Sequence, residues 1–306
     1  MTPVDQGVLF IIAGSFGFFV SRAKGSGRFA SVVSFVNIWI ALPGLFFIIY
    51  LTRGILSEDA GIAAFSVVFT LAILGFLITS SRGMAGEVRG AVVLNGAFVN
   101  AVNLPFPILQ ATMGTYSYAA TFAAMLSAMQ IIAARVLQQR LRTGSSKGAL
   151  DSLARSAPLI ALAAGILLHY VAWPASPSLG VADVSDLAEN LLIAAIFVSF
   201  GVSLSGSISR PGRALGLSSR AFKVTALARA VVGPVLALLF AASLGFGSAV
   251  YLQMVFVAAM PPAVVNTLLA RVYGFDADST ARWTAILTPL NTAEGIILLY
   301  LLGGFH

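Results

Sequence analysis

Long apolar segments alternate with short polar connectors along the whole chain, and this alternation predicts a bundle of membrane-spanning helices. A helix needs about 20 apolar residues to cross the ~30 Å hydrocarbon core of a bilayer. Ten segments of roughly this length lie at 6–21, 32–51, 60–80, 90–113, 116–138, 154–173, 188–205, 218–243, 249–272 and 283–302. The connectors between them are too short to form a soluble domain. The pattern predicts an all-α polytopic membrane protein with ten transmembrane helices.

Prolines interrupt two of these segments. Pro105 and Pro107 lie inside the fourth segment, and Pro261 and Pro262 lie near the middle of the ninth. A proline removes a backbone donor and clashes with the preceding helical turn. Because lipid offers no partner to the freed carbonyls, such a break is tolerated only against protein or beside a water-filled cavity. Two interrupted helices in corresponding halves of a chain point to the binding site of a transporter.

The spacing of the two breaks predicts an internal repeat. The broken segments are the fourth of the first five and the fourth of the second five, so residues 1–142 and 150–306 are expected to form two five-helix repeats. Because five is an odd number, the second repeat must be inverted in the membrane. Inverted repeats of this kind bring their broken helices together near the midplane. Helices 4 and 9 are therefore expected to be crossover helices.

Composition agrees with a membrane protein and excludes other classes. The 306 residues are 58% hydrophobic and 9% charged, whereas a soluble domain carries about 25% charged residues. The net charge of +7 does not indicate nucleic-acid binding, because the basic residues lie in short connectors without interleaved aromatics. With no cysteine and two histidines, neither a metal site nor a thiol-based enzyme is expected. We expect no cofactor and no enzymatic activity.

The basic residues also predict an orientation. Of the 18 lysines and arginines, 16 lie in or beside the odd-numbered connectors. The positive-inside rule places those connectors in the cytoplasm. Both termini are therefore expected outside the cytoplasm, in a plasma membrane or a bacterial inner membrane.

Several motifs resemble those of the auxin efflux carrier family, which includes plant auxin exporters and bacterial organic-acid carriers. The second segment, VVSFVNIWIALPGLFFIIYL, contains Leu42-Pro43, and the fourth has Asn100 and Pro107 at the family's asparagine and proline. The eighth contains RAVVGP at 229–234, and the ninth contains AAMPPAVVNTLLARVYGF. The resemblance covers nearly the whole chain. It departs from the family at several positions, among them Glu294 in the tenth segment.

The resemblance implies that the helices form two groups with different roles. Helices 1, 2, 6 and 7 would form a fixed scaffold, and helices 3–5 and 8–10 a mobile transport unit. The substrate would sit at the crossing of helices 4 and 9. Movement of the transport unit, called an elevator mechanism, would expose that site to each side in turn.

A half-helix that restarts after a proline break presents free N–H groups and the positive end of its dipole, both of which attract a carboxylate. Amide side chains nearby could donate to the same anion. The alternative is that these amides only satisfy freed backbone carbonyls or join neighbouring helices. The candidate substrate-binding residues are Asn37, Asn100, Asn103, Pro105, Pro107, Gln130, Pro261, Pro262 and Asn266.

Two ionisable residues lie inside apolar segments, Glu294 in the tenth and Arg229 in the eighth. Such residues are costly in a membrane and often functional. Glu294 could carry a proton in a coupled cycle, or it could pair with Arg229 as a structural ion pair. Arg229 could attract an anionic substrate or anchor the fold. The sequence leaves these alternatives open.

The sequence analysis thus favours a secondary transporter that moves a small organic anion outward by alternating access. An auxin-like monocarboxylate and a dicarboxylate both remain candidate substrates. The main alternative is a sodium-coupled organic anion symporter with the architecture of bile-acid transporters. An intramembrane enzyme would need a nucleophile with its base, and a receptor would need a signalling domain, neither of which the sequence indicates. Whether two copies associate as a homodimer stays open.

Overall fold

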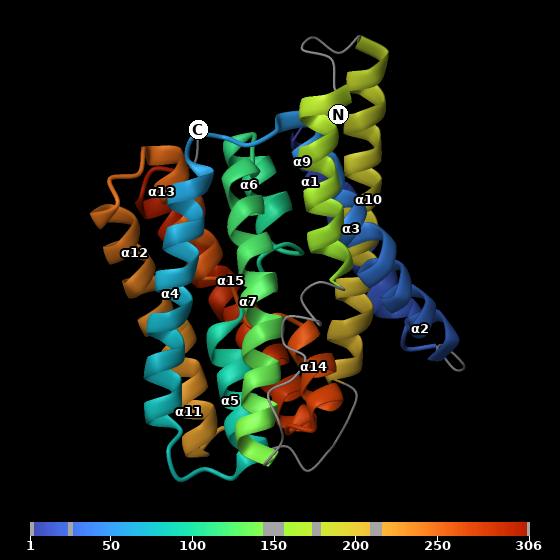
Figure 1. Cartoon of the computed structure of the whole chain (residues 1–306). Helices are drawn as coiled ribbons and strands as arrows, with labels where there is room; N and C mark the ends of the chain where they lie inside the picture. Colours follow the sequence, from blue (N-terminus) through green and yellow to red (C-terminus); the bar gives the residue numbers. More distant parts are fainter. Residues whose placement is uncertain (1–2, 24–26, 143–155, 173–178, 209–215, 305–306) are drawn as a thin grey trace. The chain divides into compact units, whose positions relative to one another are not determined.

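The computed structural model describes residues 3–23, 27–142, 156–172, 179–208 and 216–304 of the chain, shown in Figure 1. These residues are mostly helical and contain no β-strand, which confirms the all-α prediction for this part of the chain. The helices are α1 (Pro3–Val20), α2 (Gly27–Val36), η1 (Asn37–Ala41), α3 (Leu42–Arg53), α4 (Asp59–Ser80), α5 (Gly86–Ala97), α6 (Pro105–Met113), α7 (Ser117–Arg142), α9 (Ala157–Ala172), α10 (Leu179–Ile208), α11 (Arg220–Leu227), η2 (Ala228–Val232), α12 (Gly233–Ser243), α13 (Ser248–Ala258), α14 (Val265–Tyr273) and α15 (Ala277–Leu301).

Six helices of the described chain are long and apolar enough to cross a membrane. They are Gly27–Arg53, Asp59–Ser80, Ser117–Leu141, Val184–Val202, Arg220–Ser243 and Ala277–Leu301. The two proline-interrupted segments instead form pairs of short helices, α5 with α6 and α13 with α14. The chain is therefore a helical protein of the membrane-spanning type, whereas the ten-helix repeat stays a prediction.

The last helix begins earlier than its apolar pattern predicts. α15 begins at Ala277, six residues before the predicted start at 283. The Asp276 carboxylate accepts a hydrogen bond from the Ser279 backbone N–H at 3.0 Å, which is the usual way to cap a helix N-terminus. Because the first turn is polar, a search for apolar residues alone misses it.

The chain divides into two compact units, and each unit takes one segment from each half of the sequence. Unit 1 consists of residues 1–59 and 153–206, and unit 2 consists of residues 60–152 and 207–306. The division into a scaffold and a transport unit that the resemblance implies stays a prediction. Which unit is fixed and which one moves stays a prediction.

Glycines allow the helices of unit 1 to touch through their backbones. A β-carbon placed on Gly201 of α10 would overlap the Gly14 carbonyl oxygen of α1, and one on Gly17 would overlap the Val198 carbonyl oxygen. Similarly, a β-carbon on Gly165 of α9 would overlap a carbonyl oxygen of α3. In a bilayer, close approach through small residues is a main source of helix association. These glycines therefore hold the helix pairs α1–α10 and α3–α9 together.

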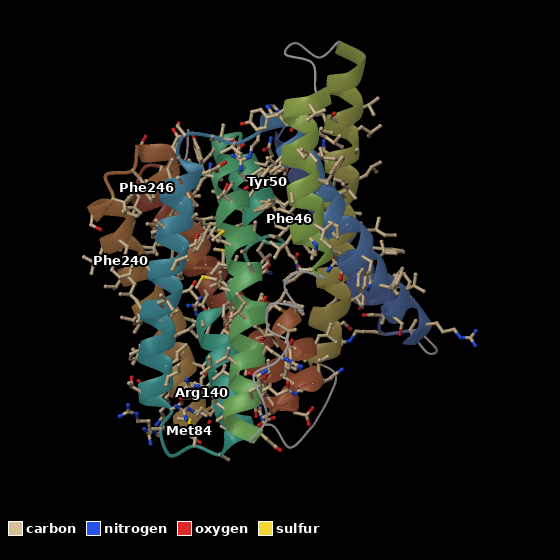
Figure 2. All side chains as sticks on the ribbon, viewed as in Figure 1. Phe46, Tyr50, Met84, Arg140, Phe240 and Phe246 are labelled. Atoms are coloured by element: carbon tan, nitrogen blue, oxygen red, sulfur yellow. The ribbon has the colours of Figure 1, made fainter. Side chains whose placement is uncertain are left out.

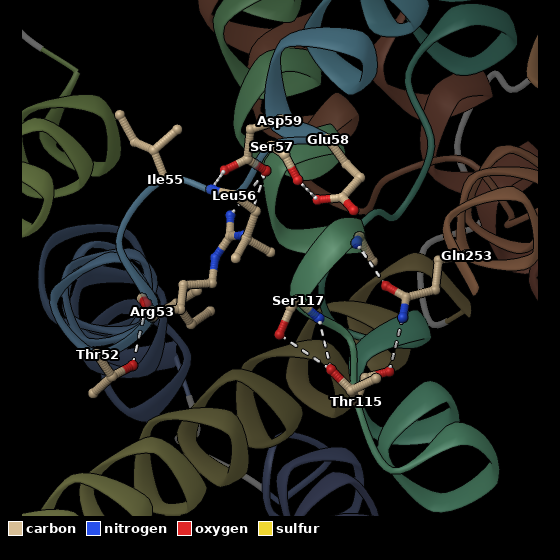
Figure 3. Close-up of polar contacts among 12 residues, drawn as sticks. Thr52, Arg53, Ile55, Leu56, Ser57, Glu58, Asp59, Thr115, Ser117 and Gln253 are labelled. Atoms are coloured by element: carbon tan, nitrogen blue, oxygen red, sulfur yellow. Dashed lines mark hydrogen bonds and ion pairs between the residues drawn. The ribbon is translucent and has the colours of Figure 1, made fainter. Parts of the chain in front are cut away.

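A buried ion pair closes the end of α3 in unit 1 (Figure 3). Two guanidinium nitrogens of Arg53 lie 3.3 Å from the Asp59 Oδ1 atom, and the other carboxylate oxygen accepts from the Leu56 N–H at 2.9 Å. The Arg53 guanidinium also stacks over the Tyr50 ring, 4.4 Å from its centroid. The pair fixes the turn that leads from unit 1 into α4.

The two broken segments of unit 2 are built alike. Their first half-helices, α5 and α13, have 12 and 11 residues, and their second half-helices, α6 and α14, have 9 residues each. Both second halves end at a left-handed glycine, Gly114 and Gly274, each with φ of 69°. Only glycine adopts this conformation without steric cost. The two broken segments are thus similar in the lengths of their half-helices and in how they end.

Basic residues gather at one end of unit 2. Figure 2 shows Arg140 at the opposite end of the unit from Phe240 and Phe246. At the end of α4, Arg220 donates to the Ser80 carbonyl at 2.9 Å and Arg89 donates to the Ile78 carbonyl at 3.1 Å. This clustering fits the predicted cytoplasmic connectors, and the orientation itself stays a prediction. Five of the basic residues used in that prediction lie outside the described residues: Lys24, Lys147, Arg155, Arg210 and Arg213.

The glycine contacts of unit 1 are testable by substitution. We expect Gly201→Ala to lower the free energy of unfolding by about 1–3 kcal/mol, because the new methyl group would overpack against the α1 backbone. The matched control is Gly75→Ala in α4, where no described atom lies within 4 Å of the added β-carbon. Its effect should stay within about 0.5 kcal/mol. Thermal unfolding in detergent measures both, and equal losses would contradict the packing described.

Candidate functional site

The two helix breaks of unit 2 are joined to each other by antiparallel backbone hydrogen bonds. The Asn100 N–H donates to the Pro261 carbonyl at 2.7 Å, and the Ala263 N–H donates to the Phe98 carbonyl at 3.0 Å. Between these bonds Val99 lies opposite a proline, forming an isolated β-bridge. Each break thus supplies partners for backbone groups that the other has lost. This satisfies the requirement that non-helical backbone at membrane depth be bonded to protein.

The two pairs of prolines take different places at the breaks. Pro105 begins α6 and Pro107 lies in its first turn, as expected for a half-helix that starts with proline. Pro261 and Pro262 instead lie in the break itself, and α14 begins only at Val265. The second half-helix therefore has no proline in its first turn. The reason is that the Pro261–Pro262 backbone is used in the bridge to the other break.

Asn266 satisfies the end of a half-helix from the opposite half of the chain. Its side chain is fully buried, and its amide nitrogen donates to the Leu94 carbonyl at 3.1 Å and to the Phe98 carbonyl at 2.9 Å. Its amide oxygen accepts from the Gln130 side chain of α7. Both amide hydrogens of Asn266 are thus used within the protein. Asn266 therefore bonds backbone carbonyls, and its contact with Gln130 joins two helices, which is the alternative to substrate binding given above for these amides.

Asn100 differs because its donor is unused. The residue is 4% exposed, and its amide oxygen accepts from the Asn103 backbone N–H at 3.0 Å. The amide nitrogen of Asn100 is buried and has no hydrogen-bond partner among the described residues. Asn103 itself is half-buried and lies just before α6. The structure thus brings an unsatisfied donor to the N-terminal end of a half-helix.

Asn37 lies in unit 1, and its predicted contact with substrate stays a prediction. It begins the π-helical turn η1, in which the Leu42 N–H donates to the Asn37 carbonyl, five residues back. The following residue is Pro43, which has no N–H to donate. The Asn37 side-chain oxygen is buried, and the described part of the chain offers it no hydrogen-bond partner.

Arg229 and Glu294 lie near each other without forming a direct ion pair. The Arg229 side chain is fully buried on η2, and none of its three nitrogens has a hydrogen-bond partner in the described chain. The Glu294 carboxylate accepts from the Asn291 amide at 2.9 Å. The two charges interact electrostatically, but no salt bridge joins these two described residues.

Sequence reasoning missed two buried amides that connect the halves of unit 2. The Gln253 side chain of α13 accepts from the Ala119 N–H at 2.8 Å and donates to the Thr115 carbonyl at 3.1 Å (Figure 3). In the reciprocal position, Asn95 of α5 donates to the Thr280 carbonyl at 2.9 Å. Each broken helix thus binds the first turn of a helix from the other half. Their only sequence signal is a polar residue inside an apolar half-helix.

The chain matches no protein-family model, and no curated protein sequence matches it. Membership of the auxin efflux carrier family therefore stays a prediction that rests on the quoted motifs. Within the described residues no group of three or more histidine, cysteine, aspartate or glutamate side chains is placed to hold a metal ion. The chemistry of the crossing is that of amides, backbone dipoles and one buried guanidinium.

The role assigned to Asn266 predicts the effect of an isosteric change. Asn266→Asp keeps the shape of the side chain but removes the donor, leaving the Leu94 and Phe98 carbonyls facing a carboxyl group. Both carbonyls keep their backbone partners, the Phe98 and Ala263 N–H groups. We still expect a loss of at least about 2 kcal/mol in the free energy of unfolding, because the new carboxyl group is buried against two carbonyl oxygens without the hydrogen bonds that the amide made, and a buried unsatisfied group costs about 1–3 kcal/mol. The matched control is Asn190→Asp on the exposed surface of α10. Thermal unfolding in detergent measures both, and an unchanged stability of Asn266→Asp would contradict the capping role.

Proposed function

We propose that this protein is a secondary transporter whose substrate is a small organic anion bound by its carboxylate at the crossing of the two broken helices. The observation that carries this proposal is the Asn100 amide nitrogen, which is buried without a partner among the described residues. A buried unsatisfied donor is unusual in a protein and calls for a specific reason. A substrate anion that accepts a hydrogen bond from the Asn100 amide would explain why this donor has no partner in the protein.

Electrostatics at the crossing favours an anion. The N-terminus of α6 lies near Asn100, since the Asn103 N–H donates to the Asn100 side chain, and the positive end of the helix dipole is equivalent to about half a charge. Pro105 and Pro107 have no N–H, and the Phe106 and Ile108 N–H groups donate to the Val102 and Leu104 carbonyls. The donors offered to an anion there are therefore the side-chain amides of Asn100 and Asn103. A carboxylate accepts several hydrogen bonds at once. The Asn100 donor and the helix end together suit it.

The same arrangement disfavours the sodium-coupled alternative. Sodium would be held by carbonyl oxygens that the helix breaks set free. Two carbonyl oxygens at this break, those of Leu94 and Phe98, accept hydrogen bonds from Asn266 and also from the backbone N–H groups of Phe98 and Ala263. The C-terminal end of α5 is thus occupied by a protein amide. We therefore favour transport without sodium, and transport is measured both with and without sodium.

Alternating access is supported by the location of the crossing within one compact unit. All the hydrogen bonds that join the two breaks lie inside unit 2. An anion bound there would travel with unit 2 as a body. The proposal therefore assigns unit 2 the role of the transport unit and unit 1 the role of the scaffold. The likeness of the two broken helices supports the inverted repeat on which such a mechanism rests.

The test is transport by purified protein in liposomes. Uptake of radiolabelled indole-3-acetate and malate is measured under an imposed substrate gradient, with and without sodium. We expect one of these carboxylates to be transported and to raise the melting temperature of the protein. If neither an aromatic monocarboxylate nor a dicarboxylate is transported or bound under any gradient, the proposed function is wrong. Transport that requires sodium would select the symporter.

One substitution separates binding from folding at the crossing. Asn100→Asp keeps the oxygen that accepts from the Asn103 N–H and replaces the free donor with negative charge. We expect the affinity for the transported carboxylate to fall by about tenfold to a hundredfold, the value of one hydrogen bond to a charged group. Because the new carboxylate lies at a position that is 4% exposed, the melting temperature without ligand should also fall, so affinity is measured well below it. Unchanged affinity in Asn100→Asp would rule out this donor as part of the site, and Asn190→Asp serves as the control.

A further inference from the structure

The buried guanidinium of Arg229 lies at the edge of the crossing. η2 is a π-helical turn, in which the Gly233 N–H donates to the Ala228 carbonyl, five residues back. π-turns inside α-helices often mark functional sites. A β-carbon on Gly233 would lie 3.0 Å from an Arg229 nitrogen and 3.5 Å from the Ala258 carbonyl oxygen. Ala258 ends α13, three residues before Pro261 of the crossing. The charge of Arg229 is thus held close to the second helix break.

α15 brings a carboxylate to the same level of unit 2. A β-carbon on Gly295 would overlap the Met260 side chain, so this part of α15 packs against the start of the second break. The adjacent residue, Glu294, is held by the Asn291 amide at 2.9 Å. The oxygen of that amide is buried, and within the described chain it accepts no hydrogen bond. Arg229, Asn291 and Glu294 therefore form a polar cluster with unused donors and an unused acceptor.

The other charged or titratable side chains of the elements packed against α15 lie elsewhere. These elements are α5, α13, α14, η2 and α11, the last through Phe222 against Trp283, 11 residues before Glu294. Their charged or titratable side chains are Glu87, Arg89, Arg220, Lys223, Arg229, Tyr251, Arg271 and Tyr273. Glu87 lies at the start of α15, where its carbonyl accepts from the Asp276 N–H. Glu294 is 18 residues further along, which is about 27 Å of helix. α14, which carries Arg271 and Tyr273, also ends close to the first residue of α15. Tyr251 lies in the first turn of α13, at the opposite end of that helix from the break. Arg229 is thus the charged group that faces Glu294 among these described residues.

We propose that Glu294 is a proton-binding site that couples proton binding to anion binding at the crossing, with Arg229 as its fixed positive charge. This inference rests on the proposed function and adds a proton as the second transported species. When Glu294 is ionised, its charge and that of Arg229 cancel. When the carboxylate takes a proton from water and becomes a neutral carboxylic acid, the cluster gains a net positive charge. That charge lies next to the crossing and attracts the organic anion.

The coupling has a defined direction. Protonation of Glu294 raises the affinity for the anion, and by thermodynamic reciprocity the bound anion raises the affinity for the proton. The loaded unit carries one proton and one carboxylate together. On the other side of the membrane the proton returns to water and Glu294 becomes ionised again. Proton and anion therefore move in the same direction.

The test measures binding of indole-3-acetate to purified protein over a range of pH in which this acid stays ionised. For wild-type protein we expect affinity to rise as pH falls, by up to about tenfold per pH unit for one linked proton. In Glu294→Gln, a permanently neutral side chain, the affinity should no longer depend on pH. Glu189→Gln is the matched control, since it removes a carboxylate from an apolar helix of unit 1. It should keep the pH dependence of the wild type.

A second measurement needs no variant. In weakly buffered solution, addition of indole-3-acetate to wild-type protein should draw protons from the solution, which a pH-sensitive dye reports. Binding without proton uptake, or a pH dependence that persists in Glu294→Gln, would overturn the coupling and leave the proposed function standing. Failure of wild-type protein to bind either indole-3-acetate or malate at any pH would instead overturn the proposed function, and the coupling with it.

Discussion

The structure of unit 2 depends on one constraint, that every backbone polar group at membrane depth must find a partner inside the protein. An unsatisfied group in hydrocarbon costs several kcal/mol. The two breaks meet this constraint by bonding to each other, through the Asn100 N–H and the Ala263 N–H. Asn266 then adds a second donor to the Leu94 and Phe98 carbonyls at the end of α5. Neither broken helix could exist in lipid without the other.

This mutual dependence explains why the functional groups lie where they do. Beside the bridge, the Asn100 amide nitrogen is a buried donor without a partner among the described residues, and the N-terminal end of α6 follows it in the chain. An unsatisfied donor and the positive end of a helix dipole in a site of low dielectric constant favour negative charge. The buried Arg229 adds to the same bias. The preference for an anion thus follows from how the breaks are closed.

Sequence pattern alone predicts the helical class of the described chain and the existence of both breaks, because proline acts locally. It predicts less well where polar turns continue a helix, as at the start of α15, where Asp276 provides a cap. It leaves the role of Asn266 open, since the Leu94 carbonyl that it binds is 172 residues away in the chain. The π-helical turn at Arg229 has a local signal, a glycine followed by Pro234 within an apolar helix, but its consequence for the arginine depends on packing against α13.

The central claim is that a carboxylate binds at the crossing through the Asn100 amide. The most direct measurement is an electron cryomicroscopy structure of the protein in lipid nanodiscs, determined with and without a transported carboxylate. The account predicts ligand density in unit 2 with a carboxylate oxygen within hydrogen-bond distance of the Asn100 amide nitrogen, while Asn266 still donates to the Leu94 and Phe98 carbonyls. Ligand density away from the crossing, or an Asn100 amide bonded to a protein carbonyl in both structures, would contradict it.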